Sequence, residues 1–223
     1  MKLKYMLAAG MMAAMTTGCN ESSFLDLKPQ GALNEDLLNS KEGIELLITS
    51  AYSALQGPNR DMMWVPMTNW TYGEVRSDNA YKGGSSITDG GDINQMETFV
   101  IDATWGNADS KWYQLYCCLQ RANEALRILN TMSEADMPEL TVRKAEMKVI
   151  RAHFYFELCR LFKQIPYLDE TIDQETYKNI PNNQFSREEI LDKIATDLLE
   201  AAKILPPRQS EIGRINQYIA YAY

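Results

Sequence analysis

The stretch that decides the fold is residues 139–164, ELTVRKAEMKVIRAHFYFELCRLFKQ. Apolar side chains recur there at spacings of three and four residues, which predicts an α-helix. They form two stripes: one of Val142, Ala145, Val149, Ala152, Phe156 and Cys159, the other of Met147, Ile150, Phe154, Leu158 and Leu161. A helix that is apolar on two faces must be covered on both sides. We therefore expect this helix in the middle of a helical stack.

Three further segments repeat this spacing on one face, namely residues 40–56, 109–129 and 186–205. Gly57-Pro58 ends the first of them and Pro206-Pro207 ends the last. Paired helices of this length, each needing a neighbour to bury its face, resemble tetratricopeptide hairpins. We therefore predict an all-α fold of tetratricopeptide-like helical hairpins with long irregular loops.

Sequence patterns indicate where two of the helices begin. Ser186 and Glu189 have the spacing of a capping box, in which the serine oxygen accepts from the amide of residue 189 and the glutamate reaches back. Gly213-Arg214 introduces one more apolar helix, which the sequence leaves at Tyr223. We expect the chain to be the N-terminal portion of a longer protein.

Residues 1–18 have the parts of a secretory signal peptide. Lys2 and Lys4 supply positive charge, and residues 6–15 form an apolar run too short to span a bilayer. The Gly18-Cys19 pair that follows resembles a bacterial lipobox, which predicts cleavage before Cys19 and lipidation of that cysteine.

The lipobox match is imperfect, because Thr16 stands where lipoboxes usually carry Leu. The alternative is an ordinary signal peptide with an incidental cysteine. The domain organisation that we predict is a signal peptide at 1–18, a lipidated tether at 19–33 and a helical domain at 34–223.

The composition excludes some classes of protein. Apolar residues make up 45% of the chain, which disfavours a disordered protein. The formal net charge of −8 repels phosphate backbones, so we expect no nucleic-acid partner. Cys117, Cys118 and Cys159 lie in apolar helical contexts without a CxxC spacing, which predicts core thiols.

Between Arg60 and Gly106 the helical periodicity disappears, and Trp, Tyr, Asn, Asp and Gly become frequent. Long loops in compact domains are usually functional or disordered, and the aromatic content favours function. A carbohydrate site needs flat apolar faces for sugar rings and polar groups for hydroxyls. The residues that we predict to bind ligand are Trp70, Tyr72, Asp78, Asn79 and Tyr81. Any one of them could instead be a packing residue.

The sequence offers little for catalysis or metal binding. His153 lies on the helix with two apolar faces, which favours a structural role. Residues 89–94, DGGDIN, supply oxygen atoms without the spacing of an EF-hand loop, which favours a polar turn. We expect no catalytic residue, no metal and no cofactor. Carboxylates are numerous, so their count alone leaves a glycosidase pair open.

Several short motifs follow one another along the chain. They are Gly18-Cys19, Phe24-Leu25-Asp26 to Pro29, Trp112-Tyr113-Gln114-Leu115-Tyr116 running to Arg121-Ala122-Asn123, Arg151-Ala152-His153-Phe154-Tyr155-Phe156-Glu157-Leu158, Ile165-Pro166 and Gly213-Arg214-Ile215-Asn216. Together they resemble the SusD/RagB family, the nutrient-binding outer-membrane lipoproteins of Bacteroidetes. Lys163 departs from the pattern, because the family often has Gly there.

The resemblance implies an all-helical tetratricopeptide scaffold whose loops bind an oligosaccharide or a similar nutrient. It also implies a SusC-like TonB-dependent transporter as the partner and a lipid anchor in the outer membrane, with the protein exposed at the cell surface. We therefore expect nutrient binding and delivery, without enzymatic activity. The alternative is a tetratricopeptide-type envelope lipoprotein that binds peptides or partner proteins through a concave helical face.

Overall fold

The computed structural model describes residues 40–56, 69–77, 79–173 and 175–223. The signal peptide predicted at 1–18, Cys19 with its tether, and the candidate ligand residue Asp78 lie outside these described residues. The helices are α4 (Lys41–Ala54), α5 (Gly91–Glu97), α6 (Gly106–Leu129), α7 (Leu140–Leu161), α8 (Arg187–Ile204) and α9 (Gln217–Ala222). The described part of the chain contains no strand, so the predicted all-α fold is confirmed.

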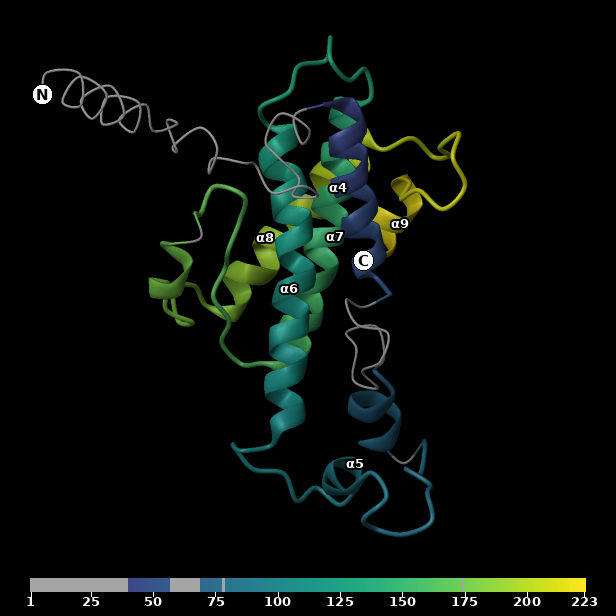
Figure 1. Cartoon of the computed structure of the whole chain (residues 1–223), viewed down its shortest axis with the longest axis vertical. Helices are drawn as coiled ribbons and strands as arrows, with labels where there is room; N and C mark the ends of the chain where they lie inside the picture. The colour runs from purple at the N-terminus through teal and green to yellow at the C-terminus, as the bar shows by residue number, and fades with distance from the viewer. Residues whose placement is uncertain (1–39, 57–68, 78, 174) are drawn as a thin grey trace, which may run out of the picture. The chain divides into compact units, whose positions relative to one another are not determined.

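Helix α7 is the centre of the helical stack, as its two apolar stripes predict. It packs against α6 on one side and α8 on the other, with further contacts to α4. Figure 1 shows α6 and α7 running side by side, with α8 crossing behind them. Ile150, Phe154 and Leu158 are completely buried. Burial of such large apolar side chains is the main favourable term in folding, at about 1.5–3 kcal/mol each.

The helix ends follow the capping signals closely. Ser186 Oγ accepts a hydrogen bond from the amide of Glu189, and the Glu189 carboxylate accepts one from the amide of Ser186. The predicted capping box of α8 is therefore confirmed. At α4, Ser40 Oγ accepts from the amide of Gly43. The last helix starts later than Gly213-Arg214 suggests, because Asn216 is its N-cap and accepts from the amide of Ile219.

Buried charges join the helices in pairs. The Arg151 guanidinium of α7 donates to both carboxylate oxygens of Asp197 in α8, at 2.8 and 2.9 Å, and also to Glu170. Burial opposes the charge on Arg151, yet these carboxylates raise its pKa above the usual value. Such a pair fixes the register of two helices, because leaving either charge unpaired in the core is costly.

A second network ties α4 and α7 to the segment before α9. Glu146 is completely buried, and its carboxylate accepts from Arg143 at 2.9 Å and from Arg214 at 3.3 Å. Arg143 and Arg214 also bind the two oxygens of Glu45 in α4. This network gives Arg214 of the Gly213–Asn216 motif a structural role.

The region predicted as irregular, from Arg60 to Gly106, contains two short helices in its described part, which begins at residue 69. One is a π-helical turn, η1 (Trp70–Val75), and the other is α5. The two pack against each other. Both are too short to display an apolar stripe, which is why periodicity does not reveal them.

The connector after α7 is irregular, as predicted, apart from the 3₁₀ turn η2 (Tyr177–Asn179). Cys118 and Cys159 are buried free thiols, as predicted for core cysteines, while Cys117 is half-buried. Burial raises the pKa of the Cys118 thiol to about 12, so it is un-ionised near neutral pH. Among the described helices, none combines the length and apolar character needed to cross a bilayer.

Candidate functional site

The η1–α5 region forms an open hollow of about 410 Å³. Its lining residues come from the end of η1, the segment after it and the end of α5; they are Val75, Arg76, Ser77, Asn79, Ala80, Tyr81, Glu97 and Phe99. Two aromatic rings at this hollow face solvent, since Tyr81 is 72% exposed and Phe99 is 63% exposed. Large exposed aromatics beside a hollow mark a surface that can bind a partner molecule.

Arg76 organises this hollow. Its guanidinium lies 4.2 Å from the centre of the Phe99 ring and donates to the carbonyl of Met96 at 3.4 Å. The arginine therefore joins the C-terminal end of η1 to the C-terminal end of α5. A cation over an aromatic face also leaves the opposite face of that ring available to a ligand.

Phe99 has a strained backbone. Its φ of 62° lies in the left-handed region, where it is the only non-glycine residue among those described. A bulky side chain in this conformation costs about 1–3 kcal/mol and persists only when its surroundings enforce it. The conformation closes α5 in a Schellman-type cap, in which the amide of Phe99 donates to the carbonyl of Met96 at 3.3 Å and the amide of Val100 to that of Gln95 at 2.9 Å.

The chemistry of the hollow combines flat apolar faces with polar edges. Tyr81 and Phe99 offer the faces, while Arg76, Asn79 and Glu97 offer donors and acceptors. The Glu97 carboxylate also accepts from the amide of Lys82 at 3.4 Å, which holds the chain after Tyr81 against α5. An arrangement of this kind suits a ligand with C–H surfaces and many hydroxyl groups.

The structure separates the residues that the sequence groups as ligand-binding. Asn79 and Tyr81 line the hollow together, whereas Trp70 and Tyr72 are not among the described residues that line it. Trp70 is half-buried at the start of η1. Asp78 belongs to the undescribed part of the chain, between two residues that line the hollow.

Tyr72 packs inward. Its ring meets the Trp105 ring edge-on at 5.8 Å, and its hydroxyl donates to the carbonyl of Asn107 at 2.9 Å. Burial raises the pKa of Tyr72 above its usual value, which keeps the hydroxyl protonated as a donor. Through these contacts Tyr72 holds η1 against the start of α6.

Arg76, Glu97 and Phe99 complete the hollow but were not among the predicted ligand residues. Arg76 lies within the same aromatic stretch of the sequence, so its charge could have identified it as a polar residue of the site. Phe99-Val100-Ile101 is an apolar run of which all three members are at least 36% exposed. Only the fold shows that this run is uncovered, because an apolar run in sequence normally predicts burial.

Polar contacts fasten α5 to the start of α6. Asp92 of α5 accepts at its carboxylate from the side-chain amide of Asn107, at 2.7 Å, and at its carbonyl from Trp105 Nε1, at 3.2 Å. The loop between Tyr81 and α5 is held by Lys82, whose ammonium donates to the carbonyls of Gly83, Ser86 and Asp89. These contacts give the loops fixed positions on the scaffold.

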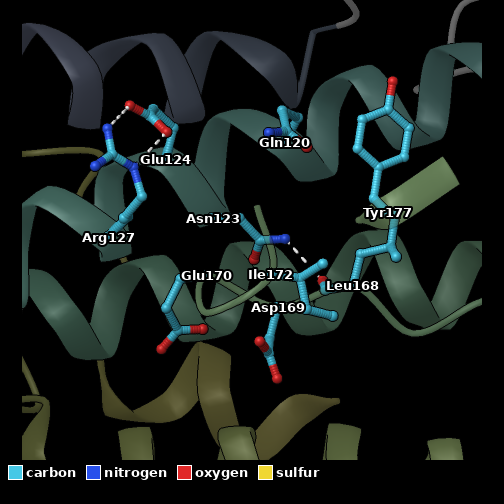
Figure 2. A pocket seen from close by; sticks show the side chains of 9 residues that line it. All are labelled: Gln120, Asn123, Glu124, Arg127, Leu168, Asp169, Glu170, Ile172 and Tyr177. Carbon is cyan, nitrogen blue, oxygen red and sulfur yellow. Dashed lines mark hydrogen bonds and ion pairs between the residues drawn. The ribbon is translucent and has the colours of Figure 1, made fainter. Parts of the chain in front are cut away.

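A polar notch lies elsewhere, between α6 and the connector after α7. Figure 2 shows its lining, with Asn123 donating to the carbonyl of Leu168 and Arg127 paired with Glu124. The notch has room for about 20 Å³, which is roughly one water molecule. It is too small for a sugar ring, and its charged groups already bind one another.

Catalytic and metal chemistry find little support in the described residues. No group of three or more His, Cys, Asp or Glu side chains there could hold a metal ion. The polar turn predicted at residues 89–94 is only partly correct: Asp89 and Gly90 lie in a turn, with Gly90 in the left-handed conformation, whereas Gly91 to Asn94 already belong to α5. His153 Nδ1 lies 2.6 Å from the Tyr223 hydroxyl, and burial lowers the pKa of His153, so this histidine is a neutral hydrogen-bonding partner.

Known proteins share this architecture. A family model described as "starch-binding associating with outer membrane" matches residues 23–223. The SusD-like protein P2 of Formosa agariphila is 23% identical over 99% of this chain and 42% of its own length. The chain therefore spans about two fifths of that relative.

Two solved structures have the same fold. A laminarin-binding SusD-like protein superposes with a TM-score of 0.66 at 24% identity, covering 82% of this chain and 38% of the other. The surface glycan-binding protein A of Bacteroides thetaiotaomicron, solved with laminarihexaose, gives 0.63 at 21% identity, covering 82% and 37%. With the family match over nearly the whole chain, the conclusion is that this chain belongs to the SusD-like family.

Proposed function

We propose that the protein captures a glycan at the cell surface through the hollow between η1 and α5. The observation that carries the proposal is the pair of exposed rings, Tyr81 and Phe99, beside the polar groups of Arg76, Asn79 and Glu97. Sugar rings stack on such faces while their hydroxyls bind the polar edges. Of the predicted ligand residues, Asn79 and Tyr81 fit this role directly. Asp78, which precedes Asn79 in the sequence, stays a prediction, as does Trp70, and Tyr72 packs inward against Trp105.

The similar proteins indicate the class of ligand. One is named for laminarin binding and another was solved with laminarihexaose. The family description names starch and the outer membrane. Glucose polymers, both α- and β-linked, are therefore the first ligands to test.

We further propose that the bound glycan passes to a SusC-like TonB-dependent transporter, without being cleaved. The motif order from Gly18-Cys19 to Asn216 supports this role, as does the family's association with the outer membrane. Lipidation at Cys19 would hold the protein at that membrane. Replacing Cys19 with Ala should move the protein from the membrane fraction to the soluble fraction, and the transporter should co-purify with the wild type in mild detergent.

Glycan affinity tests the binding site. Isothermal titration of the full-length protein with malto- and laminari-oligosaccharides should give binding that Tyr81→Ala and Phe99→Ala each weaken about tenfold, or 1.4 kcal/mol. Tyr177→Ala is the matched control, because Tyr177 is also an exposed tyrosine but lines the polar notch. Unchanged affinity in both loop variants, or no affinity for any glycan of a wide panel, would contradict the proposal.

A further inference from the structure

Two scaffold helices hold one loop residue, Asn69, from both sides. Glu157 of α7 accepts a hydrogen bond from the Asn69 side-chain amide, Nδ2 to Oε2, at 2.9 Å. Lys111 of α6 donates to the other end of the same amide, Nζ to Oδ1, at 3.3 Å. The Asn69 side chain is thereby fixed in one orientation, with its donor toward the carboxylate and its acceptor toward the ammonium.

Lys111 is an unusual residue at this place. It is 0% exposed, and Glu157 is 5% exposed, although both carry charge. Burying a charged group opposes folding unless partners satisfy it, and a whole buried charged pair can often be replaced by apolar side chains of similar volume without loss of stability. Burial also lowers the pKa of Lys111 to about 8, against its ordinary value of 10.5. The free-energy cost of burying this charge suggests that the Lys111 ammonium has a specific role.

The Lys111 ammonium faces Asn69 and η1, the segment that leads to the hollow. Besides bonding Asn69, the Lys111 nitrogen lies 5.4 Å from the centre of the Tyr72 ring. It thus contacts the residue that precedes η1 and a residue within η1. Arg160, His153 and Cys118 also contribute to the electrostatic surroundings of Lys111 and Glu157.

The position of Asn69 is transmitted to the hollow through η1. The Asn69 carbonyl accepts from the amide of Gly73 at 2.6 Å, which makes it the start of the π-helical turn. Arg76 is the C-cap at the other end of that turn, where it stacks over Phe99. A short helical turn behaves as one rigid unit, so a shift at its first residue displaces its last.

We propose that Lys111 and Glu157 are positioning residues for the glycan site. Together they fix Asn69, and through η1 they place Arg76 against Phe99 at the hollow. This inference rests on the proposed glycan-binding function, because the hollow is the site that they position. Neither residue touches the ligand, so their substitution changes affinity through the placement of η1 alone.

A reversal of hydrogen-bond direction tests the proposal. Asn69→Asp places a carboxylate against Glu157, which should repel it and weaken glycan affinity about tenfold. Glu157→Gln keeps an oxygen for the Asn69 amide and should change affinity less than about threefold. Combining both substitutions lets the new side-chain amide at position 157 donate to the carboxylate at position 69. The double variant should therefore return to within about threefold of the wild type.

Unfolding curves separate positioning from general stability. A purely structural role predicts that Asn69→Asp lowers the unfolding midpoint but leaves the affinity of the folded protein unchanged, so affinity is measured well below the unfolding midpoint of each variant. Lys111→Met is a second test, expected to lower the affinity of the folded protein about tenfold; because Glu157 loses a nearby cation, affinity is measured well below the unfolding midpoint of this variant. Lys148→Met on α7 is its control, since Lys148 pairs at the surface with Glu200. No loss of affinity in Asn69→Asp, or no recovery in the double variant, overturns the proposal.

Hydrogen exchange in the ligand-free protein distinguishes this inference from the glycan proposal. Amides of residues 70–76 should exchange faster in Asn69→Asp and regain protection in the double variant. If exchange in residues 70–76 is faster in Asn69→Asp and recovers in the double variant, while the wild type binds no glycan, the positioning of η1 stands and the proposed function fails. If glycan binding is found but exchange in η1 is unaffected, the positioning role fails by itself.

Discussion

The α6–α7–α8 scaffold and the η1–α5 region use the same types of residue in opposite ways. In the scaffold, most aromatic and aliphatic side chains are enclosed, and Phe154 and Tyr155 are 0% exposed, although Tyr113 of α6 and Leu199 of α8 are more than half exposed. In the η1–α5 region, Tyr81, Phe99 and Val100 are each more than 60% exposed. The contrast teaches that stability and recognition are carried by different parts of this chain.

The charged residues of the scaffold and of the η1–α5 region also differ in their burial. Arg151, Glu146 and Asp197 of the scaffold are buried and bound to one another or to neighbouring charges across helices. Arg76 and Glu97 beside the hollow stay partly accessible, where they can meet a ligand. Lys111 and Glu157 join the two regions, because they are scaffold residues that bind the base of the loop.

The largest effect on stability should come from Arg151→Met. The substitution leaves Asp197 buried without its bidentate partner, which costs about 3–5 kcal/mol of unfolding free energy. Urea denaturation followed by circular dichroism measures the loss. Lys41→Met, at the exposed ion pair with Glu139, should cost less than about 1 kcal/mol. Equal losses in the two variants would break the distinction between buried and exposed charges.

A medium effect should follow from Ser186→Ala. The variant loses the serine acceptor of the α8 capping box, which is worth about 1 kcal/mol. The unfolding midpoint in urea checks it, with Ser210→Ala in an exposed segment as the control. Glycan affinity should stay the same, because α8 does not line the hollow. A fall in affinity comparable to that of Tyr81→Ala would show that the two regions are not separable.

A smaller effect should appear in the pH dependence of stability. The pKa of Lys111 is lowered to about 8 in the fold, so between pH 8 and about 10 the unfolded chain binds the proton more strongly. Raising the pH through 8 therefore favours the fold, until unfolding begins to ionise Cys118 above about pH 9.

Denaturation at about pH 7.5 and pH 9 measures this difference. The stability of the wild type should rise relative to Lys111→Met by up to about 1 kcal/mol over the interval. A constant difference between wild type and variant would mean that Lys111 keeps an ordinary pKa in the fold.

The smallest effect on stability should come from Phe99→Gly. Glycine adopts the φ of 62° without strain, which offsets the loss of the Arg76 contact and leaves the unfolding free energy within about 1 kcal/mol of the wild type. Affinity for glycan should nevertheless fall at least about tenfold, because the ring is gone. Thermal unfolding and titration of the same sample give both numbers. Retained affinity would remove Phe99 from the site.

The scaffold could be predicted from the sequence because its signals are local. The two stripes of residues 139–164 predict a helix covered on both faces, and Ser186 with Glu189 predicts where α8 begins. Both predictions are confirmed by the packing of α7 and by the capping hydrogen bonds. Periodicity and capping depend on neighbours three or four residues away, which the sequence displays directly.

The site could be predicted only in part, since its members meet through tertiary structure. The aromatic composition identified the stretch and two residues of the hollow, Asn79 and Tyr81. It could not separate them from Tyr72, which packs inward on Trp105. Phe99 lies in an apolar run that predicts burial, yet the structure leaves it 63% exposed, directly after α5 and in the left-handed conformation that caps this helix.

The most direct test combines two measurements on one variant, Tyr81→Ala with Phe99→Ala. Its glycan affinity and its free energy of unfolding should be determined on the same full-length protein. The account predicts that affinity falls by more than about tenfold and at most about 100-fold, the value expected for independent contributions of the two rings, while the unfolding free energy changes by less than about 1 kcal/mol. Unchanged affinity, or a fall in affinity that accompanies a large loss of stability, would contradict the separation of recognition from scaffold.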